Sequence, residues 1–336
     1  MKPFPWHEEP LRRVARDRAR LPHALLIHGP RGIGKARFAQ ALAASVLCET
    51  PRDGLACGAC DSCRWFEQGN HPDYREIVPE ASAEDDAEVS EGEGARAEKG
   101  KSLVIKIEQI RAIADFISLS THRAGYRVLL IHPAEALHPA AANALLKTLE
   151  EPPAATLIML VSDQPARVLP TLRSRCRALP LAMPPRDEAL AWLRAEGVSD
   201  AQVALDAAGG APLFARDLAE PEETDLRRRV LAELARPGGA HASLAATIDR
   251  AAVERFIYWL QTWTQDLVHR RIAGSVRHHR DFAAALEARA RGASLERLFD
   301  LDRELAAARA VASHPLNPRL LAEHLLLAYN RATSDR

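Results

Sequence analysis

The sequence has 336 residues, of which 47% are hydrophobic, 27% are charged and only 5% are aromatic. These proportions are typical of a globular chain of two or three domains with aliphatic cores. Lysine plus arginine and aspartate plus glutamate both number 45, so no global basic field favours nucleic-acid binding, and DNA contact has to be local or shared with partners. Because the N-terminus has no apolar signal-peptide core and no apolar run is long enough to span a membrane, we expect a cytoplasmic protein without a membrane partner.

The first predicted elements are a strand, a glycine-rich loop and a helix. Residues 23–28 form a mostly apolar run, the loop GPRGIGK follows at 29–35, and apolar side chains recur at helical spacing over 35–47. This order is the context of a phosphate-binding P-loop. The candidate nucleotide-binding residues are Gly29, Gly32, Gly34 and Lys35. The alternative is that the glycines only make a tight turn between strand and helix.

Four of the five cysteines, Cys48, Cys57, Cys60 and Cys63, follow this helix closely. Eight residues separate the first two and two residues separate each later pair, so thiolates from a helix end and a tight knuckle can converge tetrahedrally on zinc. In a reducing compartment such a cluster favours metal ligation over disulfides. We predict a structural zinc ion (Zn2+) held by these four residues, against the alternative of free buried thiols.

Two further residues, one of them a possible ligand, are not assigned to this metal site. His71 is an alternative ligand by position, but four cysteines already satisfy the ion, so we interpret it as an ordinary loop histidine. Cys176 lies far from the cluster in sequence and is interpreted as a small core residue.

Residues 80–101 differ in composition from the rest of the chain. They contain eight acidic residues against three basic ones, and they cannot bury enough apolar surface to order themselves. We predict a disordered acidic insertion; the alternative is a regulatory tail.

The elements on both sides of this insertion alternate between strands and helices. Strands are predicted at 73–78, 128–131, 156–162 and 178–181, and helices at 107–119 and 140–150. Apolar strands that alternate with helices are typical of an α/β fold with a parallel sheet covered on both faces.

The magnesium side of the predicted nucleotide site lacks its ligands. Ala36 stands where a P-loop has serine or threonine, and His132-Pro133 follows the strand after which ATPases place an acidic pair. Glu135 lies farther along, where we expect the chain to have turned away. We therefore expect weak or no ATP binding, no Mg2+ site and no intrinsic ATPase activity. The alternative is an active ATPase that uses Lys35 and an unrecognised carboxylate.

After residue 185 only helices are predicted. Helical patterns at 187–196 and 200–208 indicate a small helical domain. A larger all-helical domain is predicted from the patterns at 222–236, 251–272, 282–291, 295–311 and 318–332, which glycine and proline breaks separate.

Four features taken together resemble the clamp-loader subunits of bacterial DNA polymerase III, which have an AAA+ fold. They are the loop 29–35, the four cysteines, the run AANALLKTLEEPP at 141–153 and the motif Ser174-Arg175-Cys176. The resemblance implies an AAA+ type P-loop domain over 1–182, with a zinc module at 48–63 and the insertion at 80–101. It also implies a helical lid at 183–220 and a helical collar at 221–336, through which subunits form a ring.

Within that family the combination is similar to a subunit that does not hydrolyse ATP, rather than to the tau/gamma ATPase, because His132-Pro133 replaces the acidic pair. The resemblance implies that Arg175, with Ser174 and Cys176 as its motif, is an arginine finger that acts in trans on a neighbouring tau/gamma subunit. The family's lid arginine would fall near Pro212.

The implied partners are the tau/gamma and delta subunits, the sliding clamp, and primer-template DNA reached through the complex during replication. Lys106, Arg111 and Arg123 are candidate phosphate contacts, with solvated surface charges as the alternative. A zinc-dependent DNA-binding module is disfavoured because the cysteine knuckle lacks a basic recognition helix.

Overall fold

The computed structural model describes residues 2–82, 102–113, 116–117, 125–237, 242–312 and 316–334. It divides the chain into two compact units, Met1–Pro185 and Arg186–Arg336. The predicted acidic insertion lies outside the described residues except at its start, where Glu80–Ser82 forms a 3-10 turn. The separation of the second unit into a lid and a collar stays a prediction.

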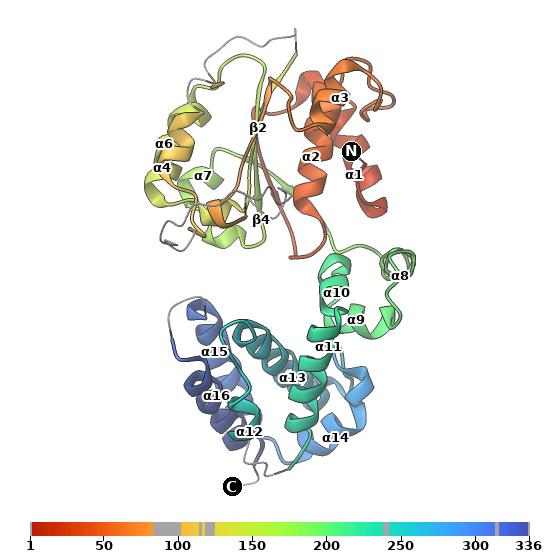
Figure 1. The fold of residues 1–336 in the computed structure, drawn as a ribbon, viewed down its shortest axis with the longest axis vertical. Coiled ribbons are helices and arrows are strands. Elements are labelled where there is room, and N and C mark those ends of the chain that lie inside the picture. The colour runs from red at the N-terminus through yellow and green to blue at the C-terminus, as the bar shows by residue number, and fades with distance from the viewer. Residues whose placement is uncertain are drawn as a thin grey trace, which may run out of the picture. The chain divides into compact units, whose positions relative to one another are not determined.

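A parallel five-stranded sheet with strand order β2-β3-β4-β1-β5 forms the centre of the first unit (Figure 1). The strands are β1 (Ala24–His28), β2 (Tyr74–Ile77), β3 (Arg127–Ile131), β4 (Thr156–Ser162) and β5 (Arg177–Pro180). Every residue of β3 and β4 is buried, because helices cover both faces of a parallel sheet and leave no polar side. The predicted α/β architecture is confirmed.

Helices lie on both sides of this sheet. Figure 1 shows α1, α2 and α3 on one side and α4, α6 and α7 on the other. Their bounds are α1 (Glu8–Ala15), α2 (Lys35–Leu47), α3 (Asp61–Glu67), α4 (Ile107–Ala112), α6 (Pro139–Glu150) and α7 (Pro170–Arg173). α2 has the predicted bounds, and its side chains Phe38, Leu42 and Val46 are buried, as the helical spacing of apolar residues requires.

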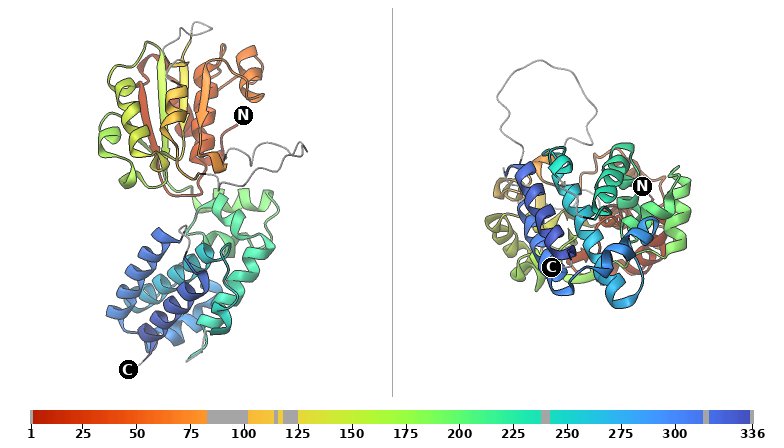
Figure 2. Two further views of the ribbon diagram at one scale, coloured as in Figure 1. Left: turned by 60° about the vertical axis from the view of Figure 1, so that its left-hand side comes forward. Right: turned by 90° about the horizontal axis from the view of Figure 1, so that it is seen from below.

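The second unit is all-helical among its described residues. Its helices are α8 (Arg186–Ala195), α9 (Ala201–Ala207), α10 (Pro212–Leu218), α11 (Pro221–Leu234), α12 (Ala242–Ala245), α13 (Val253–Ala273), α14 (Ala283–Arg291), α15 (Leu295–Val311) and α16 (Pro318–Thr333). α15 and α16 lie side by side in both Figure 1 and Figure 2, and both contact α13.

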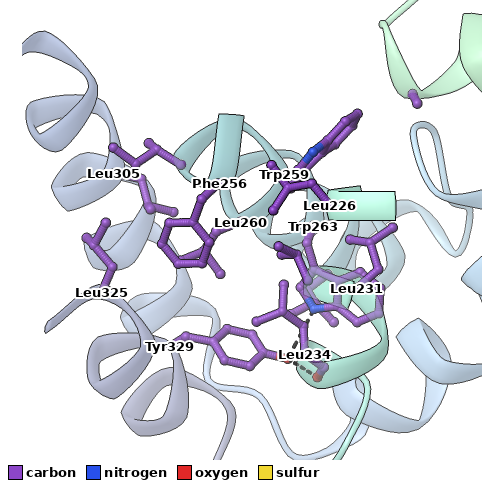
Figure 3. Packing of buried hydrophobic residues seen from close by; sticks show 14 of the residues in the cluster. Leu226, Leu231, Leu234, Phe256, Trp259, Leu260, Trp263, Leu305, Leu325 and Tyr329 are labelled. Carbon is purple, nitrogen blue, oxygen red and sulfur yellow. Dashed lines mark hydrogen bonds between the residues drawn. The ribbon is translucent and has the colours of Figure 1, made fainter. Parts of the chain in front are cut away.

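α13 carries the centre of the second unit's core. Phe256, Trp259, Leu260 and Trp263 recur at helical spacing and are fully buried. Figure 3 shows these side chains packed among leucines of α11, α15 and α16, together with Tyr329. No described helix is long and apolar enough to cross a membrane.

The sequence patterns missed several short helices. α10 follows the predicted break at Gly209-Gly210 and begins with Pro212, a residue that is well suited to the first position of a helix. α1 and α3 were also missed; α3 forms the second half of the predicted cysteine knuckle.

Candidate functional site

The glycine-rich loop connects the carboxyl end of β1 to the start of α2, as predicted. Gly32 and Gly34 have φ values of 79° and 89°, a left-handed conformation that favours glycine. At Gly29 an added Cβ would lie 2.3 Å from the carbonyl oxygen of Leu181, so the close approach of the chain after β5 requires glycine there. These residues form the backbone turn that a phosphate loop needs.

Lys35 is not available at the surface of this loop. It is only 4% exposed, its ammonium group donates a hydrogen bond to the carbonyl of Pro30, and it forms an ion pair with the carboxylate of Asp163. Asp163 directly follows β4 and was not among the predicted site residues. Its position could have indicated a role in the site, because it stands at the carboxyl end of a strand, the edge at which parallel α/β sheets build their sites.

A hydrogen-bonded side-chain cluster lies at the end of β3, where ATPases place their acidic magnesium ligands. His132 Nε2 lies 2.6 Å from Glu76 Oε1, and Glu76 also accepts hydrogen bonds from Gln40 at 3.0 Å and from the Tyr74 hydroxyl at 2.7 Å. Burial raises the pKa of Glu76, but the hydrogen bonds from His132 and Tyr74 outweigh it, so the pKa lies below its ordinary value. The carboxylate of Glu76 is thus engaged within the cluster.

We expected the chain to have turned away from the strand ends at Glu135, but it has not. Glu135 lies in the 3-10 turn Ala134–Ala136, and its Oε1 accepts a hydrogen bond from the backbone amide of Asp163 at 3.1 Å. The turn returns the chain toward the end of β4 within three residues. Glu135 therefore supports the residue that pairs with Lys35.

The segment before α1 packs against the loop from the other side. The indole of Trp6 donates a hydrogen bond to the carbonyl of Ile33 at 2.9 Å. His7 is buried beside Phe38, and neither of its ring nitrogens has a partner among the described residues. Burial first, and the charge of Lys35 second, lower the pKa of His7 to about 4. The histidine is therefore neutral at physiological pH.

The four predicted cysteines come together in space. Their Sγ atoms all lie within 4.8 Å of one another, and two pairs, Cys48 with Cys60 and Cys57 with Cys63, are each separated by 3.9 Å. A tetrahedral site with metal–sulfur bonds of about 2.3 Å requires sulfur separations of about 3.8 Å. Both the geometry and the donor set therefore fit a soft divalent metal ion.

Local structure places each of these sulfurs. Cys48 caps the C-terminus of α2, and Cys60 caps the N-terminus of α3, where its Sγ accepts from the amide of Cys63. Backbone amides also donate to Cys48 at 3.2 Å and to Cys57 at 3.4 Å. Such donors stabilise thiolates and orient metal ligands.

Hydrogen bonds and burial shift the pKa values of three of these thiols. A hydrogen bond with Thr50, followed by backbone amide donors, lowers the pKa of Cys57 to about 5. Burial raises the pKa of Cys48 and of Cys63. A bound divalent cation would supply the positive charge that four adjacent thiolates require.

His71 and Cys176 have other surroundings. His71 Nε2 lies 2.8 Å from the Ser62 hydroxyl, and its Nδ1 accepts from the amide of Asp73 at 3.1 Å. Cys176 is half-buried at the edge of the first unit's core, and burial raises its pKa to about 11. Neither belongs to the group of four sulfurs.

Arg175 follows α7 and lies against the end of α6. Its Nε donates to Glu150 Oε1 at 2.8 Å, and its NH1 group donates to the carbonyl of Thr171 at 3.0 Å. Ser174 Oγ lies 3.3 Å from NH1. The guanidinium is thus held by its own motif and by Glu150, a residue that was not predicted to take part.

The remaining residues named from the sequence are the lid position and the candidate phosphate contacts. Pro212 is the first residue of α10. Lys106 forms an ion pair with Glu80, Arg111 is an exposed residue of α4, and Arg123 lies outside the described residues.

The chain is similar to known proteins over most of its length. A family model described as DNA polymerase III, delta subunit, matches residues 9–185. The chain is 33% identical over 268 residues to DNA polymerase III subunit delta' of Pseudomonas aeruginosa, covering 78% of this chain and 76% of that one. The corresponding Escherichia coli K12 subunit is 34% identical over 278 residues, with 80% and 77% covered. The Yersinia pestis subunit is 33% identical over 348 residues, with 98% and 96% covered.

These matches confirm the clamp-loader family that the sequence motifs indicated. They also specify the type of subunit, because all three relatives are delta' subunits. The chain belongs to the delta' family of DNA polymerase III subunits.

Proposed function

We propose that this chain is a non-hydrolysing delta' subunit of the clamp loader. It would stand in a ring beside an active tau/gamma subunit, supply Arg175 to that neighbour's ATP site, and help to load the sliding clamp onto primer-template DNA in the cytoplasm. A fixed guanidinium stabilises the charge that develops on a transferred phosphoryl group. The tau/gamma and delta subunits are the proposed direct partners.

The observation that carries the proposal is the contrast between the chain's two nucleotide-related features. Lys35 is paired internally with Asp163, and the magnesium side presents Ala36 and His132 instead of ligands. Arg175, by contrast, is present and hydrogen-bonded in place. The chain's own site has lost its chemistry, and the residue that would serve a neighbour is retained.

The other parts of the chain have structural roles in this proposal. The four cysteines would hold a zinc ion, since four sulfur donors at tetrahedral separations are typical of structural zinc. Residues 1–182 would form the AAA+ type domain, 183–220 the lid, and 221–336 the collar through which the subunit joins the ring. Because the loop retains Lys35, we expect it to bind phosphate weakly at most.

A reconstituted clamp loader tests the role of Arg175. Arg175→Ala should leave the subunit folded and assembled and should lower ATP turnover by the complex, by roughly 1,000-fold at the active site that the arginine serves. Arg173→Ala is the matched control, because Arg173 lies two positions earlier and its side chain makes a hydrogen bond only to the carbonyl of Pro165 among the described residues. Undiminished turnover with Arg175→Ala would refute the proposal.

The competing function, an ATPase in its own right, has a simple test. The purified chain should hydrolyse no ATP above background. Turnover by the isolated chain that disappears in Lys35→Ala would favour the ATPase instead.

A further inference from the structure

The partner of Arg175 is an acidic residue at an unfavourable place in its own helix. Glu150 is the last residue of α6 and Glu151 follows it. A helix C-terminus carries partial negative charge, so carboxylates there are disfavoured and cations are favoured. The stability of α6 therefore does not explain why a glutamate stands at position 150, whereas its ion pair with Arg175 does.

Glu150 contacts one particular edge of the guanidinium. Its Oε1 accepts from Nε at 2.8 Å and lies 2.5 Å from NH2. A guanidinium has five N–H groups in a rigid plane. Glu150 uses the edge formed by Nε and the near N–H of NH2, and Thr171 and Ser174 engage NH1. The second N–H of NH2 is not needed for these contacts, and the Arg175 side chain is 35% exposed.

We propose that Glu150 is a positioning residue for the arginine finger. Its carboxylate fixes the edge of the Arg175 guanidinium formed by Nε and NH2, so that the remaining N–H of NH2 is presented to the neighbouring subunit's phosphate. An unrestrained arginine loses considerable rotamer freedom when it is ordered, and Glu150 orders it before the neighbour arrives. Glu150 itself does not contact nucleotide. This inference rests on the proposed function, since it requires Arg175 to act in trans.

The contact between Glu150 and Arg175 could also inhibit the finger, and inhibition would change ATP turnover in the opposite direction. If Glu150 mainly restrained Arg175 and neutralised its charge, removing the carboxylate would free the finger and raise turnover. Positioning predicts that removal lowers turnover, because misplacement of a group that acts on the transition state is costly even when it is small. The direction of the change therefore decides between the two.

The test uses the complete reconstituted clamp loader with sliding clamp and primed DNA. Glu150→Ala should lower kcat for ATP roughly tenfold, less than the loss of the arginine, and leave KM for ATP unchanged. Glu150→Gln keeps an acceptor oxygen for Nε and should stay within about threefold of the wild type. Glu151→Gln is the matched control: Glu151 is exposed and its side chain makes no hydrogen bond or ion pair with another described residue, so turnover should not change.

A double variant separates positioning from a structural role. In the Arg175→Ala background, Glu150→Ala should cause no further loss, because a positioning residue acts only through the group that it holds. A further loss there, a rise in turnover with Glu150→Ala alone, or no effect of Glu150→Ala while Arg175→Ala remains damaging would each overturn the role of Glu150 alone. No effect of Arg175→Ala would overturn the proposed function and this inference together. Assembly and melting temperature of each variant confirm that the compared complexes are intact.

Discussion

Asp163 holds the ammonium group of Lys35 in an ion pair inside the glycine-rich loop. In a working phosphate loop that lysine contacts the phosphates of the nucleotide. Here a carboxylate of the same chain supplies the negative charge. An entering phosphate would have to displace Asp163 and would be repelled by it.

Removing this carboxylate should therefore uncover phosphate binding. Asp163→Asn should bind magnesium-free ATP at least about tenfold more tightly than the wild type, a gain of roughly 1.4 kcal/mol, because Lys35 loses its internal counter-ion. Isothermal titration of the purified chain measures both affinities. Adding Lys35→Ala to this variant should abolish the gain, and equal affinities of wild type and Asp163→Asn would contradict the explanation.

The cysteine cluster predicts a defined metal content. The purified chain should contain about one zinc ion per molecule, and Cys60→Ser should reduce this to near zero, because one missing ligand opens a closed tetrahedral site. Atomic absorption gives the metal content. Circular dichroism should show lost helix, since binding free energy of this kind is also folding free energy.

Cys176→Ser is the control for that measurement, because Cys176 lies outside the four-sulfur group. Its metal content should equal that of the wild type. Full metal content in Cys60→Ser, or none in the wild-type chain, would rule out the proposed site.

His7 should make the stability of the first unit dependent on pH. Folding lowers its pKa from 6.5 to about 4, so its contribution is complete above pH 6.5 and is lost as the pH falls toward 4. Through His7 alone, the free energy of unfolding should decrease by about 2 kcal/mol between pH 7 and pH 5. His7→Phe keeps an aromatic ring against Phe38 and should remove this part of the slope.

Guanidinium unfolding of both proteins at the two pH values checks this expectation. The comparison is between slopes, so a constant difference in stability caused by the new ring does not affect it. Identical pH dependence in His7→Phe and the wild type would mean that His7 is not held neutral in the folded chain.

In the second unit, Tyr329 connects two buried polar groups. Its hydroxyl donates to the carbonyl of Leu234 at 2.7 Å and accepts from the indole of Trp263 at 3.1 Å (Figure 3). Tyr329→Phe leaves both groups unsatisfied in the core and should cost about 3 kcal/mol of unfolding free energy. Tyr258→Phe, which removes one hydrogen bond to Ala207, should cost about 1 kcal/mol. Denaturant titration measures the unfolding free energy of both variants. A smaller loss of unfolding free energy for Tyr329→Phe than for Tyr258→Phe would disprove the connecting role of Tyr329.

The elements with strong periodicity could be predicted from the sequence, often to the residue. α2, β4 and α15 have the expected bounds because their apolar spacing is uninterrupted and a glycine or a polar cap marks at least one end. α10 was missed because Gly209-Gly210 marks a break just before it and its first residue is a proline, a residue that often ends helices, although a proline in the first turn costs no hydrogen bond. Local pattern alone does not distinguish these two uses of proline.

The site was predictable where its residues are close in sequence. The cysteine cluster and the glycine loop depend on spacing within one segment, and both were found. The pairs Lys35 with Asp163, Glu76 with His132, and Glu150 with Arg175 join segments far apart in the chain. They depend on the strand order of the sheet and on where α6 ends beside α7, which side-chain spacing does not specify.

α2 is fixed at both of its ends. Lys35 at its first residue is paired with Asp163, and Cys48 directly after its last residue belongs to the cysteine group. The helix is about 20 Å long, so it connects the loop to the cysteine group as one rigid segment. With Lys35 paired at one end and a zinc ion held at the other, as the proposed function has it, α2 would have no nucleotide-dependent movement to transmit, and the first unit would keep one conformation throughout the proposed neighbours' ATP cycle.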